Sequence, residues 1–343
     1  MPRPRDRRGA CARRRISWLA ALLALSAGAA AGSPASARLR LVAVGGEPYA
    51  PLDRVATFYG MRLSAQGARA TRLHSAWSTL DVTHESRRAA LNGTTLWLHA
   101  PARGLRGAPR AAVSAADLDT VLDPLLRSAD HLGRYRCRTI LLDPGHGGRD
   151  HGATGIGGLR EKDVALDLAR RVRLRLVNRG YRVHLTRDAD REVSLAGRVA
   201  EARRVRADLL VSLHLNAASA PSAHGVETFV LTAQGQPSTH ESRPPRSANS
   251  AFPGLAHVAA STALGFEVQH ALRRHTGAAD RGLRRARYQL LRDAPCPAIL
   301  VECGFVSNPS EASRLRTSAY LDRIADGIAE GIAAYDRRTR AAR

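Results

Sequence analysis

The spacing of apolar residues along the second half of the chain alternates between two periods. Short apolar runs of strand length are separated by stretches in which apolar residues recur every three or four positions, as at Val164, Leu168 and Val172. The first pattern is typical of buried strands and the second of helices with one apolar face. The patterns predict strands at 139–143, 181–186, 208–213, 226–231 and 298–303 and helices at 161–178, 195–205, 261–275 and 320–335. We therefore expect an α/β domain over 135–343, with a mostly parallel sheet and helices on both of its faces.

The preceding region, at about 38–134, has a different pattern. Short segments of alternating apolar and polar residues at 38–44 and 79–83 predict strands. Asn92-Gly93 separates two more such segments and predicts a tight hairpin of type I′. Ser114 and Asp117 form a capping box that predicts a short helix. These signals indicate a small α+β domain before the larger α/β domain.

The segment at 232–258 interrupts the order of strands and helices. It is rich in Pro, Ser and Gln between Gln234 and Pro253 and shows no apolar periodicity. We expect a flexible, exposed insertion that serves either as a flap over a site or as a solvated loop without a role.

The chain is strongly basic, with a formal net charge of +23 over 343 residues. Lys162 is the only lysine, so 52 of the 53 basic residues are arginine. This skew is typical of the codon bias of a GC-rich genome, and the sequence has neither the aromatic motif of an RNA-binding sheet nor a cysteine-rich finger. We therefore expect solvated arginines and no nucleic-acid partner.

The first 37 residues have the features of a secretory signal peptide. Seven arginines and one aspartate precede an apolar run from Ile16 to Gly32, and Ala35-Ser36-Ala37 provides a cleavage site. The run is short for a membrane span, so we expect removal rather than a stable membrane anchor. Arg13-Arg14 resembles a twin-arginine export signal. We predict export to the periplasm or cell envelope, with a charge of +17 on the mature chain because the removed segment carries +6.

Polar residues follow several of the predicted parallel strands, where the ligands of open α/β sheets bind. His146 lies in a Gly-rich loop after the first strand, and His214 ends another. Two histidines with a carboxylate can hold a catalytic zinc ion and leave one position open. Asp143 and Asp150 are candidates to orient the histidines.

Glu302 follows the apolar run Pro297–Val301, and burial of a carboxylate there is costly unless it is paired or functional. A carboxylate with a raised pKa suits a general base that acts on water beside a metal ion. The alternative is a buried structural ion pair with an arginine such as Arg187.

Seven sequence blocks, in order across about 139–335, resemble the zinc-dependent N-acetylmuramoyl-L-alanine amidases. They occur at 143–153, 161–166, 185–188, 195–198, 207–216, 225–228 and 300–309, and include Asp143-Pro-Gly-His-Gly-Gly-Arg-Asp150 and Leu300-Val-Glu302-Cys-Gly-Phe305. No single block is specific, but seven in the correct order are. The region at 38–134 loosely resembles the amine-oxidase-like stalk domains that precede some secreted cell-wall enzymes.

The resemblance implies a phosphorylase/hydrolase-like fold, Zn²⁺ as cofactor, and His146, Glu161 and His214 as its ligands. It further implies that Glu302 is the catalytic glutamate and that the substrate is peptidoglycan, cleaved between N-acetylmuramic acid and L-alanine during cell-wall remodelling or cell separation. Some relatives carry an inhibitory helix in the region of 232–258 that an activator protein displaces, whereas this segment is short and rich in proline.

Three other interpretations remain open from the sequence. A non-catalytic cell-wall-binding protein could have kept the fold, although all four site positions are filled here. A nucleic-acid binder would use the arginines, and would show salt-dependent affinity for DNA. A zinc peptidase acting further along the stem peptide would give different cleavage products.

Overall fold

The computed structural model describes residues 33–105 and 111–343, and 34–343 group into one unit by their contacts. The predicted signal peptide falls almost entirely outside the described residues and stays a prediction. Its expected cleavage triplet begins the described chain, where Ala35–Arg38 forms a 3₁₀ turn (η2) with Ala35 buried. Within the described ranges, no helix is long and apolar enough to cross a membrane.

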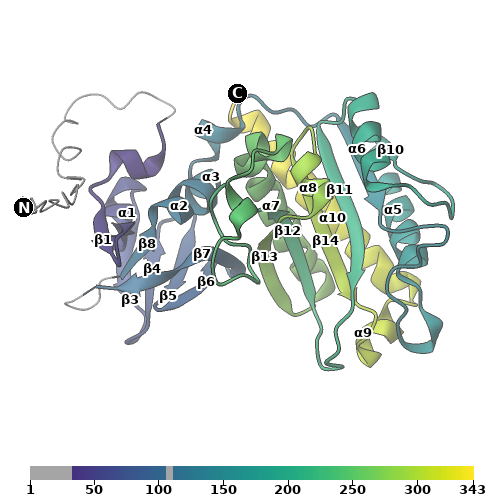
Figure 1. The fold of residues 1–343 in the computed structure, drawn as a ribbon, viewed down its shortest axis with the longest axis horizontal. Coiled ribbons are helices and arrows are strands. Elements are labelled where there is room, and N and C mark those ends of the chain that lie inside the picture. Colours follow the sequence, from purple (N-terminus) through teal and green to yellow (C-terminus); the bar gives the residue numbers. More distant parts are fainter. Residues whose placement is uncertain (1–32, 106–110) are drawn as a thin grey trace, which may run out of the picture. The chain divides into compact units, whose positions relative to one another are not determined.

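The sheet of the second half has the strand order β10-β9-β11-β14-β12-β13 (Figure 1). All neighbouring pairs in this order are parallel except β12 and β14, which are antiparallel. The strands are β9 (Thr139–Pro144), β10 (Arg182–Leu185), β11 (Leu209–Asn216), β12 (Val226–Leu231), β13 (Asp280–Ala286) and β14 (Ala298–Phe305). The expected mostly parallel sheet is confirmed, with one antiparallel pair inside it.

Helices cover both faces of this sheet, as the apolar pattern predicts. The strand residues alternate between two apolar clusters, so that Leu142 and Val211 face one layer while Leu141 and Leu210 face the other. The first layer contains α5 (Glu161–Val177), α7 (Val258–Thr276) and α10 (Ser318–Ala341), and the second contains α6 (Leu195–Arg204) and α8 (Gln289–Asp293). The short α9 (Pro309–Arg314) follows β14.

The first half of the described chain forms the expected small α+β region. Asn92 and Gly93 both have positive φ angles, 49° and 75°, as a type I′ hairpin requires. The Ser114 side chain accepts a hydrogen bond from the Asp117 amide, which confirms the helix cap. The strands are β1 (Val42–Val44), β2 (Glu47–Pro51), β3 (Arg62–Ala65), β4 (Ala70–His74), β5 (Thr79–Thr83), β6 (Ser86–Leu91), β7 (Thr94–Gly104) and β8 (Ala111–Ser114). The helical segments are α1 (Leu52–Phe58), α2 (Ala115–Asp117), a π-helical turn η3 (Leu118–Leu122), α3 (Asp123–Leu126) and α4 (Ser128–Leu132).

Strand β13 was not predicted from the sequence, and it joins the two halves. It pairs in parallel with β12 on one side and with β7 on the other, where Leu283 lies opposite Leu96. Three of its seven residues are arginines, so it lacks the apolar run by which the other strands were predicted. The hairpin sheet and the α/β sheet are therefore continuous, and the expected division near residue 134 stays a prediction.

The segment at 232–258 contains two short 3₁₀ turns, η5 (Arg246–Asn249) and η6 (Pro253–His257). Its first part is anchored by Arg87 of β6, which donates to the carbonyl oxygens of Ser238 at 3.1 Å and Glu241 at 2.8 Å. The Thr239 amide also donates to the Arg285 carbonyl oxygen at 2.9 Å. A residue of the first half thus restrains the segment for which the sequence predicts flexibility.

We predict that Arg87→Ala accelerates hydrogen exchange at the amides of 238–241 about tenfold or more. Hydrogen bonds from a charged donor contribute about 1.5–3 kcal/mol each, and about 1.4 kcal/mol corresponds to a factor of ten. Arg88→Ala is the matched control, because Arg88 is the neighbouring residue of β6 and is exposed. Equal exchange in the two variants would show that Arg87 does not hold the segment.

Candidate active site and metal centre

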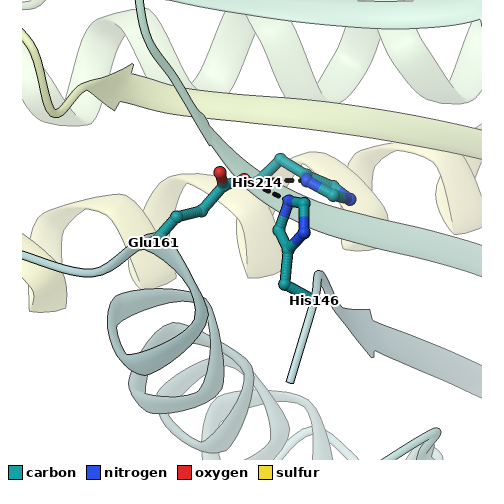
Figure 2. Close-up of side chains that lie close together, drawn as sticks. All are labelled: His146, Glu161 and His214. Carbon is teal, nitrogen blue, oxygen red and sulfur yellow. Dashed lines mark hydrogen bonds and ion pairs between the residues drawn. The ribbon is translucent and has the colours of Figure 1, made fainter. Parts of the chain in front are cut away.

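Three side chains from distant parts of the sequence meet at the carboxyl edge of the sheet (Figure 2). His146 follows β9, Glu161 is the first residue of α5, and His214 lies near the end of β11. One Glu161 oxygen, Oε1, is 3.2 Å from His146 Nε2 and 2.9 Å from His214 Nδ1. One nitrogen or oxygen atom from each residue lies within 4.8 Å of the others. The three residues named from the sequence are therefore brought together.

Glycines allow the backbone to approach these side chains closely. A Cβ atom on Gly145 would lie 2.4 Å from the His214 ring, and one on Gly152 would lie 2.6 Å from Glu161 Oε2. Both distances are far below van der Waals contact, so any side chain at either position would displace a member of the cluster. His146 itself has a φ of 59°, a left-handed conformation that few non-glycine residues adopt.

Two buried arginines hold the loop that carries His146. Arg198 of α6 donates to the carbonyl oxygens of Pro144 at 2.8 Å and His146 at 2.9 Å. Arg187 donates to the carbonyl oxygens of Pro144 at 3.1 Å and Gly145 at 2.7 Å. These bonds fix three consecutive main-chain carbonyls. They therefore fix the backbone position from which the side chain of His146 extends.

The two aspartates expected to orient the histidines have different partners. Asp150 Oδ2 lies 2.8 Å from His146 Nδ1, while Nε2 of the same ring faces Glu161. Asp143 contacts neither histidine, but accepts hydrogen bonds from Arg198, Thr186 and Ser212. Asp150 therefore orients the ring directly, whereas Asp143 acts on the loop through Arg198.

The charges of the cluster are coupled. Burial opposes ionisation of Glu161, but hydrogen bonds from His146 and His214 outweigh it and hold the pKa of Glu161 well below its usual range. The hydrogen bond to Glu161 raises the pKa of His146, with a smaller contribution from Asp150. Glu161 is consequently an anion at neutral pH, which is the form that binds a metal ion.

Glu302, on β14, forms no ion pair with a basic side chain in the residues that the structure describes. It lies opposite His214 in the β11–β14 pairing and opposite Glu227 in the β12–β14 pairing. Its Oε2 is buried and forms no hydrogen bond within the part of the chain that the structure describes. Burial raises the pKa of Glu302 well above its usual value, and the charges of Glu161 and Glu227 raise it further. The alternative ion pair is not formed, because Arg187 donates instead to main-chain carbonyls.

The cluster and Glu302 line one pocket of about 620 Å³. One wall comes from the loop before α6 and the other from the start of α8. The lining residues outside the four named site positions include Asp143, Asp150, Glu192, Val193, Ser194, Leu195, Arg198, Asn216, Tyr288, Gln289, Leu290 and Leu300. The pocket is large enough for a sugar or a short peptide segment beside the cluster.

Sequence reasoning missed the neighbours of Glu302. Glu227 is buried and binds Asn216 Nδ2 at 2.7 Å, Arg281 Nε at 2.9 Å and Arg284 Nε at 2.8 Å. Both arginines belong to β13. Because the sequence pattern did not predict this strand, it did not predict these contacts either. The charge of Glu227 within a fully buried strand was the available signal.

The donor set fits a catalytic zinc ion. Two imidazole nitrogens and one carboxylate oxygen are the ligands of several zinc hydrolases, which leave another position for water or substrate. The contact between Asp150 and the second ring nitrogen of His146 is the support that metal-binding histidines commonly have.

Comparison with known proteins gives matches to amidases over the second half of the chain. The N-acetylmuramoyl-L-alanine amidase LytC of Bacillus subtilis strain 168 is 36% identical over 199 residues, which cover 58% of this chain and 36% of LytC. AmiC of Neisseria meningitidis is 35% identical and covers 57% of this chain and 52% of its own length. The solved structure of AmiC2 of Nostoc punctiforme is 34% identical, covers 58% of this chain and 96% of that one, and has a TM-score of 0.49.

This chain spans about a third to a half of the length of these two curated relatives. The family model described as N-acetylmuramoyl-L-alanine amidase matches residues 140–334, more than half of the chain. That range contains His146, Glu161, His214 and Glu302. The chain belongs to the N-acetylmuramoyl-L-alanine amidase family.

Proposed function

We propose that this protein is a zinc-dependent amidase that hydrolyses the bond between N-acetylmuramic acid and L-alanine in peptidoglycan, during cell-wall remodelling or cell separation. Family membership supports the substrate class. The observation that carries the proposal is that one pocket contains His146, Glu161, His214 and a Glu302 whose Oε2 is buried without a hydrogen-bond partner among the described residues. A wall-binding protein without activity would have no need of a carboxyl group whose buried oxygen has no hydrogen-bond partner.

His146, Glu161 and His214 would hold the zinc ion, through His146 Nε2, His214 Nδ1 and a Glu161 oxygen. A bound zinc ion supplies Lewis-acid polarisation of the scissile carbonyl and makes water more acidic. Asp150 keeps the proton of His146 on Nδ1, so that Nε2 stays free as a donor of its lone pair.

Glu302 is the proposed proton carrier. Its Oε2 has no other partner, so it can accept the proton of the attacking water. The protonated carboxyl then gives that proton to the departing nitrogen as the C–N bond breaks. The products are a free lactyl carboxylate on the sugar and a free amino group on L-alanine. The raised pKa of Glu302 favours the protonated state that the second step requires.

The proposed location follows from the substrate. Peptidoglycan lies outside the cytoplasm, so the protein would act after export, in the periplasm or cell envelope, as the first 37 residues predict. Peptidoglycan is the proposed partner, and an activator protein stays a prediction.

The proposal is tested by the products formed from a defined disaccharide-peptide. Mass spectrometry should find the intact disaccharide with a free lactyl carboxylate, together with a peptide that begins with L-alanine. Cleavage between later residues of the stem would assign the protein to the peptidases instead, and an absence of cleavage after zinc loading would favour the wall-binding interpretation.

We predict that Glu302→Gln lowers kcat by about 10²–10⁴-fold, the usual contribution of a positioned acid–base group, while one zinc per chain is retained. His146→Ala should instead lose the metal as well as the activity. Metal content measured by mass spectrometry separates the two variants without an activity assay. Substantial hydrolysis by Glu302→Gln would remove Glu302 from the proposed mechanism.

We further predict that Asp150→Asn weakens zinc binding by about 10- to 100-fold, as is usual when the partner of a metal-bound histidine is replaced. The Asp150 carboxylate accepts a hydrogen bond from His146 Nδ1 and so favours a proton on that nitrogen, whereas an asparagine side chain favours it less. Competition with a chromophoric chelator measures the affinity, and Asp163→Asn is the control, since Asp163 lies at the same helix end and pairs with Arg160. Equal affinities of the two variants would argue against an orienting role for Asp150.

A further inference from the structure

A cluster of arginines surrounds two adjoining hollows at the end of the sheet opposite to the metal centre. The hollows measure about 150 and 330 Å³ and share Cys137, Arg138 and Arg340 as lining residues. The arginines that line one or both are Arg136, Arg138, Arg179, Arg182, Arg340 and Arg343. We call this set the arginine cluster.

The arginine cluster is remote from the proposed active site. Its members lie just before β9, at the turn after α5 and the start of β10, and at the end of α10. Strand β9 begins there at Thr139 and ends at Pro144, two residues before His146. Six residues at about 3.3 Å each separate the two regions by roughly 20 Å. A ligand in the hollows would therefore leave the pocket at Glu302 accessible.

Few carboxylates balance the arginine cluster. Asp336 lines one hollow, and it already binds Arg340 at 2.7 Å and the Tyr181 hydroxyl at 2.9 Å. Asp208 accepts hydrogen bonds from the main-chain amides of Arg138 and Thr139. In the described residues, the other five arginines of the cluster form no ion pair with an acidic side chain.

The neighbouring helix α5 differs from the cluster in its charge balance. Four arginines of α5 each pair with an aspartate, at distances of 2.5–2.9 Å. The pairs are Arg170 with Asp188, Arg171 with Asp167, Arg173 with Asp188 and Arg175 with Asp326. Exposed arginines such as Arg62 and Arg69 also form no ion pair among the described residues, but the arginines of the cluster are distinguished by lining the same two hollows.

Stabilisation of helix ends accounts for only part of the arginine cluster. Arg179 and Arg340 lie at the carboxyl ends of α5 and α10, where positive charge is favourable. Arg136, Arg138 and Arg182 lie on no helix and are exposed. Their gathering around the same hollows needs another explanation, and anion binding provides one.

The geometry points to phosphate groups as the ligands. Guanidinium groups bind phosphate oxygens through paired hydrogen bonds. Two hollows with a shared wall suit successive phosphates of one flexible polymer. Among the described residues, the only aromatic side chain that lines the hollows is Tyr181, whose hydroxyl is bound to Asp336. These residues therefore lack the exposed aromatic surface on which single-stranded nucleic acids stack their bases. We propose that the arginine cluster binds a phosphodiester polymer without bases, of the poly(glycerol phosphate) type.

This inference is independent of the proposed amidase activity and is tested by binding alone. Fluorescence anisotropy of a labelled poly(glycerol phosphate) oligomer is measured against the full chain at low salt. Arg136→Ser/Arg138→Ser/Arg182→Ser should bind about tenfold more weakly, because three phosphate contacts are lost. The control Arg62→Ser/Arg69→Ser/Arg88→Ser removes the same charge from exposed positions of the first half, and should change affinity less than about twofold.

Three results would overturn the proposal. Equal weakening in both triple variants would assign binding to the net charge of the whole protein. No binding by the unaltered chain would exclude the ligand. The third result is that single-stranded DNA with the same number of phosphates binds more tightly than poly(glycerol phosphate), and that the first triple variant loses this binding. It would make the cluster a nucleic-acid site. Thermal unfolding of each variant confirms that the fold is kept.

Discussion

The hydrogen bonds from two buried guanidinium groups to the loop after β9 are the interaction on which the proposed site depends. Arg187 and Arg198 satisfy the carbonyl oxygens of Pro144, Gly145 and His146, which would otherwise lie unpaired near the end of a buried strand. Because a buried guanidinium is costly without partners, these bonds stabilise one loop conformation over alternatives. That conformation includes the left-handed backbone of His146, and it directs the imidazole toward Glu161.

Three carboxylates lie at the same edge of the sheet, and their partners give them different tendencies to ionise. Glu161 is shared by two histidines, and Glu227 is held by Asn216 and two arginines of β13. Glu302 alone has a buried oxygen without a partner among the described residues. Ionisation is therefore favoured at the first carboxylate and disfavoured at the third. A metal ligand and a proton carrier require this difference, since one must stay charged and the other must exchange a proton.

The sequence predicted the features that depend on local pattern. Apolar runs located β9, β11, β12 and β14, and the carboxyl ends of three of them bring His146, His214 and Glu302 together. The apolar pattern did not predict β13, because three of its residues are arginines. These arginines find partners only in the folded chain, including Glu227 and the carbonyl oxygen of Trp97. The role of Asp143 was also beyond sequence reasoning, since its contact with Arg198 joins two elements 55 residues apart. The hydrogen bonds from Arg87 to the main chain of 238–241 span an even longer separation.

The central claim is that His146, Glu161 and His214 together bind one zinc ion. Zinc K-edge X-ray absorption on the purified full chain tests it directly, because it reports the number and type of the atoms around the metal. We predict one zinc per chain, surrounded by nitrogen and oxygen atoms that include two imidazole nitrogens. A sulfur-containing shell would place the metal at a cysteine, and an unchanged spectrum in His146→Ala or His214→Ala would contradict the assigned ligands.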